Sequence, residues 1–69
     1  MSGRVSGVVR WFNQPRGYGY ITGDDGREAR VGREALDDGT FLTEGIRVTY
    51  LLVGEDDDNL RAEHVRIVE

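Results

Sequence analysis

Residues 10–21 read RWFNQPRGYGYI and hold four of the six aromatic residues of the chain. Tyr18 and Tyr20 are two positions apart, so in a strand both rings lie on one face of the sheet. Gly17 and Gly19 then fall on the opposite face, where the absence of a side chain lets another strand approach closely. The stretch therefore predicts an aromatic strand that packs tightly on its glycine side.

The same stretch carries arginines beside its rings, Arg10 upstream and Arg16 just before the tyrosines. Stacking of a base on an aromatic ring is worth about 1–3 kcal/mol and tolerates any base, because every base has a π-face. Arginine can stack its planar guanidinium or bind a phosphate with two hydrogen bonds. This pattern favours single-stranded nucleic acid as the ligand. The alternative is that the tyrosines belong to the core, since aromatic residues are common in strands.

Length and composition exclude several classes of protein. The 69 residues have room for one small domain, which we expect to span residues 1–69. There is no cysteine and only one histidine, His64, so the sequence predicts no disulfide, no metal site and no cofactor. No apolar run approaches the ~20 residues of a membrane helix, and we expect a cytoplasmic protein that does not bind membranes. The sequence shows no Ser-His-Asp set and no phosphate-binding loop, so we expect neither enzymatic activity nor a small-molecule substrate.

Charge is unevenly distributed along the chain, whose net charge is −4. Residues 1–36 contain six arginines and four acidic residues, a balance of +2, whereas residues 37–69 contain three arginines and nine acidic residues, a balance of −6. The net negative charge argues against a general binder of polyanions. The basic half is also the half that carries the aromatic stretch.

Five segments read as strands between turn residues. They are residues 4–13, 18–22, 28–33, 46–53 and 60–68, with a single helical turn expected at 33–36 and an acidic loop at 54–59. In a regular first strand Val9 and Trp11 would share a face, so the pattern leaves open whether Trp11 is buried. In the last strand, regular alternation places Ala62, His64, Arg66 and Val68 on one face and Glu63, Val65 and Ile67 on the other.

Five short strands, glycine-rich turns and no long helix predict a small all-β, antiparallel barrel. The five-stranded Greek-key OB-type barrel, which binds oligonucleotides, fits this pattern, and an SH3-like barrel is the alternative.

Residues 1–13 and 16–21 resemble a bacterial cold-shock protein, and the resemblance covers the whole chain. The RNA-binding motif of that family reads Lys-Gly-Phe-Gly-Phe-Ile; here Arg16 replaces Lys, and Tyr18 and Tyr20 replace the two Phe. The resemblance implies a five-stranded OB-type barrel that binds single-stranded RNA and DNA with low sequence specificity. It also implies a role as an RNA chaperone or as a regulator of transcription and translation. We expect a monomer, with a strand-exchanged dimer as the alternative.

The resemblance also implies which side chains bind nucleic acid. Trp11, Tyr18 and Tyr20 match exposed stacking rings, which favours an exposed Trp11, and Phe41 matches a further aromatic residue in a loop. The polar positions that match base or phosphate contacts are Arg10, Asn13, Arg16 and Asp25.

One segment departs from the family pattern. The second family motif reads roughly Val-Phe-Val-His-Phe, and residues 29–33 here read ARVGR. Arg30 and Arg33 replace the two phenylalanines and Gly32 replaces the histidine, so three rings are missing. Because arginine can stack on bases or pair with phosphates, we expect both arginines to bind nucleic acid, with a shift from stacking towards electrostatic attraction.

Two functions remain open from the sequence. In the first, the barrel binds single-stranded nucleic acid; in the second, it has weak or lost nucleic-acid binding and serves protein–protein contact. Arg30 and Arg33 discriminate between them. Convergence with the two tyrosines favours the first, and ion pairs with Asp24, Asp25, Glu28 or Glu34 favour the second.

Overall fold

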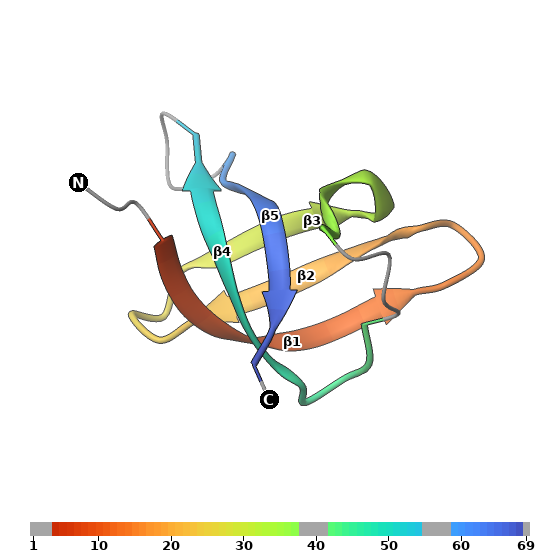
Figure 1. The fold of residues 1–69 in the computed structure, drawn as a ribbon, viewed down its shortest axis with the longest axis horizontal. Helices are drawn as coiled ribbons and strands as arrows, with labels where there is room; N and C mark the ends of the chain where they lie inside the picture. The colour runs from red at the N-terminus through yellow and green to blue at the C-terminus, as the bar shows by residue number, and fades with distance from the viewer. Residues whose placement is uncertain (1–3, 38–41, 55–58, 69) are drawn as a thin grey trace.

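The computed structural model describes residues 4–37, 42–54 and 59–68. In these residues the elements are β1 (Arg4–Asn13), β2 (Tyr18–Gly23), β3 (Glu28–Gly32), the 3-10 turn η1 (Arg33–Ala35), β4 (Arg47–Val53) and β5 (Arg61–Ile67). The strands close into one barrel in the order β1-β2-β3-β5-β4 (Figure 1). All neighbouring strands are antiparallel except β3 and β5, which pair in parallel. The predicted five-stranded OB-type barrel is confirmed, with this one parallel contact.

Strand β1 is the longest and pairs with two partners. Its residues 4–8 pair with β4, and residues 7–13 pair with β2. The register with β2 shifts between Val9 and Trp11, so that Val9 pairs with Ile21 while Trp11 pairs with Tyr20. Such a bulge places one extra residue, Arg10, in β1 and bends the strand. Val9 is therefore fully buried, and Trp11 lies on the outer face.

Gly19 faces the inside of this bulge. A Cβ on Gly19 would overlap the carbonyl oxygen of Trp11 and would lie 2.7 Å from the Cα of Phe12. The predicted close approach on the glycine side of the aromatic strand is thus present. Gly17 is also required by the backbone conformation, because its φ of 75° is one that other residues rarely adopt.

The faces of β5 differ from those predicted. Ala62 and Val65 are both buried although they are three positions apart, and His64 between them is exposed. The register with β4 shifts between Thr49 and Leu51, and His64 has a φ of 52°. The prediction of regular alternation was wrong here, because a bulge at this position turns Ala62 and Val65 to the same side.

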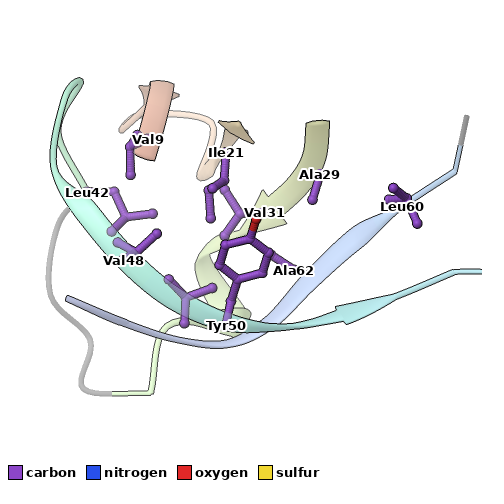
Figure 2. Close-up of a cluster of buried hydrophobic side chains, with 10 residues drawn as sticks. Val9, Ile21, Ala29, Val31, Leu42, Val48, Tyr50, Leu60 and Ala62 are labelled. Atoms are coloured by element: carbon purple, nitrogen blue, oxygen red, sulfur yellow. The ribbon is translucent and has the colours of Figure 1, made fainter. Parts of the chain in front are cut away.

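The barrel interior holds one hydrophobic core (Figure 2). Its buried members in the described residues are Val9, Ile21, Ala29, Val31, Leu42, Val48, Tyr50, Leu60, Ala62 and Val65. Tyr50 is the largest of the fully buried side chains, and burial raises the pKa of its hydroxyl. Tyr18 and Tyr20 are not part of this core, so the alternative interpretation that they are core residues is wrong.

The turns tie the strands together at both ends of the barrel. Residues 14–17 join β1 to β2 and project on the right in Figure 1, below η1. The Gly17 N–H donates to the Asn13 carbonyl at 2.7 Å, and the Gly26 N–H closes the opposite turn by donating to the Gly23 carbonyl at 2.9 Å. In the described part of the chain, no helix is long and apolar enough to span a membrane.

Candidate nucleic-acid interface

Three rings form one cluster on the outer face of β1 and β2. The ring centres of Trp11 and Tyr18 are 5.5 Å apart with planes at 74°, and those of Trp11 and Tyr20 are 5.3 Å apart at 57°. All three side chains are half-buried. Edge-to-face and tilted pairs at such distances are favourable for aromatic rings. This aromatic cluster leaves ring surface exposed on which a base can stack.

Arg30 extends the aromatic cluster onto β3. It is exposed and pairs in register with Tyr20, and its guanidinium carbon lies 5.3 Å from the centre of the Tyr18 ring. A guanidinium at this distance is attracted by the ring and offers its own plane for stacking. Within the described residues Arg30 makes no ion pair, so its positive charge is available to a ligand.

Arg33 has a different environment from Arg30. Its Nη2 donates to the Gln14 carbonyl at 2.9 Å, and its guanidinium lies against Gly17, where a Cβ would be 2.9 Å from the Arg33 Cζ. Arg33 therefore holds the β1–β2 turn and is not brought onto the aromatic cluster. Ion pairs of Arg30 or Arg33 with nearby acidic residues would have favoured the protein-contact function. Among the described residues, neither arginine forms an ion pair with Asp24, Asp25, Glu28 or Glu34.

Arg10, Asn13 and Arg16 are positioned by β1 and its turn. Arg10, the extra residue of the bulge, is exposed and forms an ion pair with Glu28 across the sheet. The Asn13 Oδ1 accepts a hydrogen bond from the Arg16 N–H at 3.0 Å, so Asn13 shapes the turn. The Arg16 side chain is exposed beside Gly17. Asn13 pairs in register with Tyr18, and Arg16 lines the same hollow as Tyr18.

Asp25 lies at the other end of β2, in the β2–β3 turn. Its Oδ1 accepts from the Arg27 N–H at 3.0 Å and its Oδ2 from the Arg27 Nε at 2.8 Å. These hydrogen bonds hold the pKa of the Asp25 carboxyl below its ordinary value. The structure thus gives Asp25 a role in the turn. Phe41, the predicted loop ring, lies outside the described residues.

The structure adds a hollow beside the aromatic cluster that the sequence did not reveal. It has a volume of about 610 Å³ and lies between β3, β5 and η1. Its walls include Tyr18, Arg30, Glu34, Arg61 and Glu63. Arg61 comes from a distant part of the sequence and reaches the site because it is the parallel partner of Arg30. The sequence alone gives no sign that Arg61 lies beside Arg30, because their proximity depends on the pairing of β3 with β5.

A second feature missed in the sequence is the support of the β1–β2 turn. The Gln14 Nε2 donates to the Leu42 carbonyl at 2.6 Å. Leu42 is fully buried, so this bond anchors the turn to the core. Gln14 therefore helps to hold the aromatic strands in place.

The sequence of the chain also matches a known protein family. The family model described as the 'Cold-shock' DNA-binding domain matches residues 5–68. The chain belongs to the cold-shock DNA-binding domain family. The family consists of nucleic-acid binders without enzymatic activity, so the predicted functional class is confirmed.

Several curated cold-shock proteins are similar to this chain. The major cold shock protein CspA of Pseudomonas aeruginosa is 34% identical over 70 residues, which cover 99% of this cold-shock domain and 100% of the relative. Cold shock protein 1 of Lactiplantibacillus plantarum is 45% identical over 47 residues, covering 65% and 71% of the two chains. A cold shock-like protein of Thermotoga maritima is 37% identical over 67 residues, covering 94% and 100%.

Proposed function

We propose that this cold-shock domain binds single-stranded RNA or DNA through the aromatic cluster and Arg30, without a strict sequence requirement. In this role it acts in the cytoplasm as a monomeric RNA chaperone or as a regulator of transcription and translation. The observation that carries the proposal is the position of the Arg30 guanidinium, 5.3 Å from the centre of the Tyr18 ring, beside two further rings. Bases stack on this surface, and the arginines attract the phosphate backbone.

The second family motif is degenerate in this proposal. Of the three positions that carry rings in the family pattern, Arg30 alone lies on the aromatic cluster; Arg33 supports a turn, and Gly32 has no side chain. Binding then depends less on stacking and more on charge than in an aromatic-rich relative. Each phosphate neutralised on a single strand adds about 0.7 to the slope of log affinity against log salt.

Protein–protein contact is the less supported function. Ion pairs between Arg30 or Arg33 and Asp24, Asp25, Glu28 or Glu34 would favour it. Three of these four acidic residues have other partners: Asp24 binds Arg47 at 2.8 Å, Asp25 binds Arg27 at 2.8 Å, and Glu28 binds Arg10. Among the described residues the fourth, Glu34, forms no ion pair with Arg30 or Arg33. The positive charge of Arg30 therefore remains available to bind a nucleic acid.

The experiment is a titration of the protein with an oligothymidine of about seven nucleotides, inside the roughly 4–16 nucleotides that an OB fold covers. Trp11 is the only tryptophan, so its fluorescence reports on the proposed surface. We expect saturable quenching, and an affinity that falls about tenfold or more between roughly 50 and 200 mM salt if three or more phosphates are contacted. Absence of quenching at tens of micromolar, with a folded protein, would overturn the proposal.

Chaperone activity needs its own readout. An RNA hairpin with a fluorophore and a quencher at its ends brightens when it opens. We expect the protein to open it at concentrations that saturate oligothymidine binding. Normal oligothymidine binding without opening of the hairpin would refute the chaperone role and leave the binding role intact.

A further inference from the structure

We infer that the hollow beside the aromatic cluster binds a guanine base, and that the Glu34 carboxylate reads its Watson–Crick edge. The inference rests on the proposed function and adds a base preference to it. It concerns one subsite on β3 and η1, next to the rings that stack bases of any kind.

Glu34 is held over β3 by the absence of a side chain at Gly32. A Cβ on Gly32 would lie 2.8 Å from the Cδ of Glu34, too close for real atoms. The Glu34 carboxyl group therefore lies directly on the outer face of the last β3 residue. Gly32 pairs in register with Tyr18, and directly paired residues on one face of a sheet have neighbouring side-chain positions. The carboxylate is thus adjacent to the ring on which Arg30 lies.

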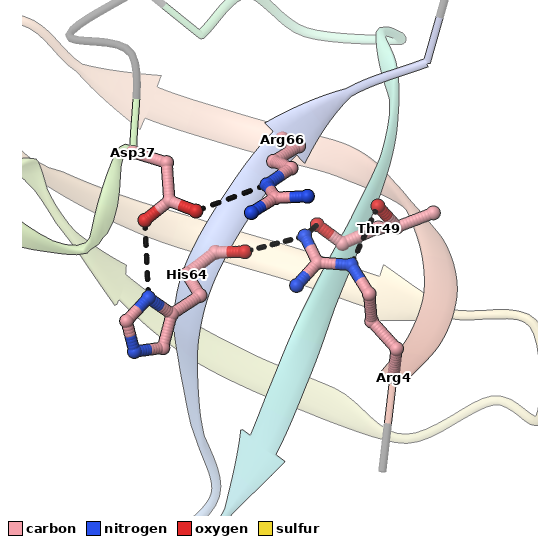
Figure 3. Close-up of polar contacts among 5 residues, drawn as sticks. All are labelled: Arg4, Asp37, Thr49, His64 and Arg66. Atoms are coloured by element: carbon pink, nitrogen blue, oxygen red, sulfur yellow. Dashed lines mark hydrogen bonds and ion pairs between the residues drawn. The ribbon is translucent and has the colours of Figure 1, made fainter. Parts of the chain in front are cut away.

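Glu34 differs from the other acidic residues that line the hollow. Glu63 lies 3.9 Å from Arg61, and Asp37 binds Arg66 at 3.0 Å and the His64 ring at 3.1 Å (Figure 3). Among the described residues Glu34 has no hydrogen bond and no cationic partner. Its carboxylate oxygens are free to accept hydrogen bonds from a ligand in the hollow.

An unpaired carboxylate in a nucleic-acid site selects for hydrogen-bond donors. It repels phosphates, and an ionised carboxylate only accepts hydrogen bonds. Guanine presents two adjacent donors, N1–H and the N2 amino group, which match the two oxygens of a carboxylate. Thymine and uracil present one ring N–H between two carbonyl oxygens, which the carboxylate repels. In a single strand this edge is not used for base pairing and can be read directly.

The remaining walls supply what such a base needs. The Arg30 guanidinium, lying on the Tyr18 ring, offers a flat surface for stacking. Arg61, the parallel neighbour of Arg30, and Arg16 also line the hollow and carry the positive charge that a flanking phosphate requires. The volume of about 610 Å³ is within the range of ordinary ligand pockets.

The test compares heptathymidine with the same oligonucleotide carrying one central guanine, which cannot form a quadruplex. Dissociation constants are taken from the shape of the Trp11 titration, because guanine itself changes the quenching amplitude. We expect the guanine oligonucleotide to bind at least about fivefold more tightly, the lower end of discrimination by a bidentate base contact. An inosine in the same place lacks the N2 amino group and should lose most of this preference.

The variants separate base reading from a change of net charge. Glu34→Gln should lower affinity for the guanine oligonucleotide and leave heptathymidine binding unchanged or slightly tighter. Glu44→Gln is the matched control: Glu44 is exposed outside the hollow, so its removal should affect both ligands equally.

The outcomes distinguish the inference from the function on which it rests. A guanine preference that is lost in Glu34→Gln and kept in Glu44→Gln supports the inference. Equal binding of both oligonucleotides by the unaltered protein overturns it and leaves the proposed function standing. Binding of neither overturns both.

Discussion

Gly19 lies directly against the backbone of Trp11, so closely that a Cβ on Gly19 would overlap the Trp11 carbonyl oxygen. The contact occurs where β1 bulges, at the step that turns the Trp11 ring from the core side to the outer face. The ring surface on the outside of the sheet thus depends on the absence of a side chain on the inside.

Gly19→Ala should therefore destabilise the fold and disturb the aromatic cluster. Forcing an extra methyl group against backbone costs about 1–3 kcal/mol or more, because the neighbour is not a flexible side chain. A chain of this size has roughly 3–10 kcal/mol of stability in total. Urea unfolding should show the loss, and at low urea the Trp11 emission maximum should also change.

Gly26→Ala is the control for this substitution. Gly26 has a φ of 90° and nothing within 4 Å of an added Cβ. The cost there is backbone strain alone, about 1–2 kcal/mol, with no change in Trp11 emission. Equal stability losses with unchanged emission in both variants would contradict the role assigned to Gly19.

Much of the barrel was predictable because turn residues and β-formers mark the strands. The predicted first strand, residues 4–13, has the same bounds as β1, and the other strand ends differ by at most one residue. The two bulges were not predictable from alternation. Each bulge adds one residue to a strand and so reverses the face of the residues after it. For this reason the sequence could not decide whether Trp11 is buried, and the faces of β5 were assigned wrongly.

The candidate site was predictable only where one strand carries it. Tyr18 and Tyr20 share a face by elementary geometry, and the structure places their rings together with Trp11. Arg30 and Arg33 looked equivalent in sequence, but η1 begins at Arg33 and turns its side chain to the β1–β2 turn. The hollow depends on β3–β5 pairing, which no local pattern encodes.

Removal of one ring from the aromatic cluster should weaken binding without changing its salt dependence. Tyr20→Ala removes a stacking surface worth about 1–3 kcal/mol, so the affinity for oligothymidine should fall roughly 5- to 150-fold. Tyr20→Phe keeps the ring and should bind within about twofold of the unaltered protein, since stacking uses the π-face. Fluorescence titration at two salt concentrations measures both effects. A large loss in Tyr20→Phe would instead assign the contact to the hydroxyl.

Arg30 should contribute both charge and a stacking plane. Arg30→Ala should lower affinity and reduce the slope of log affinity against log salt by about 0.7, the value for one phosphate on a single strand. Arg30→Lys keeps the charge and loses the plane, so its slope should stay near that of the unaltered protein while its affinity falls. Unchanged affinity in both variants would remove Arg30 from the binding surface.

Arg33 should behave differently, although it is only three positions away. Its guanidinium binds the Gln14 carbonyl and covers Gly17. Arg33→Ala should cost about 1 kcal/mol of unfolding free energy, the typical value of one hydrogen bond. Its salt slope should change less than that of Arg30→Ala. A slope change equal to that of Arg30→Ala, with no loss of stability, would place Arg33 at the phosphates.

Asp37 connects the segment after η1 to β5 (Figure 3). Its Oδ2 accepts from the Arg66 Nε at 3.0 Å, and its Oδ1 lies 3.1 Å from the His64 Nδ1. The hydrogen bond from Arg66, followed by that from His64, lowers the pKa of the Asp37 carboxyl in the folded protein. A lowered folded pKa means that this carboxylate stabilises the fold above its unfolded pKa, and that the contribution is lost as pH falls through the folded pKa.

Asp37→Asn should therefore be less stable than the unaltered protein at neutral pH, and the difference should disappear in acid. The loss should occur below about pH 4, the ordinary pKa of an aspartate, because only there does the unaltered protein lose the same charge. Thermal unfolding from neutral pH down to strong acid, followed by circular dichroism, measures the difference directly. A gap between the two proteins that persisted in strong acid would show that the Asp37 contribution does not depend on its ionisation.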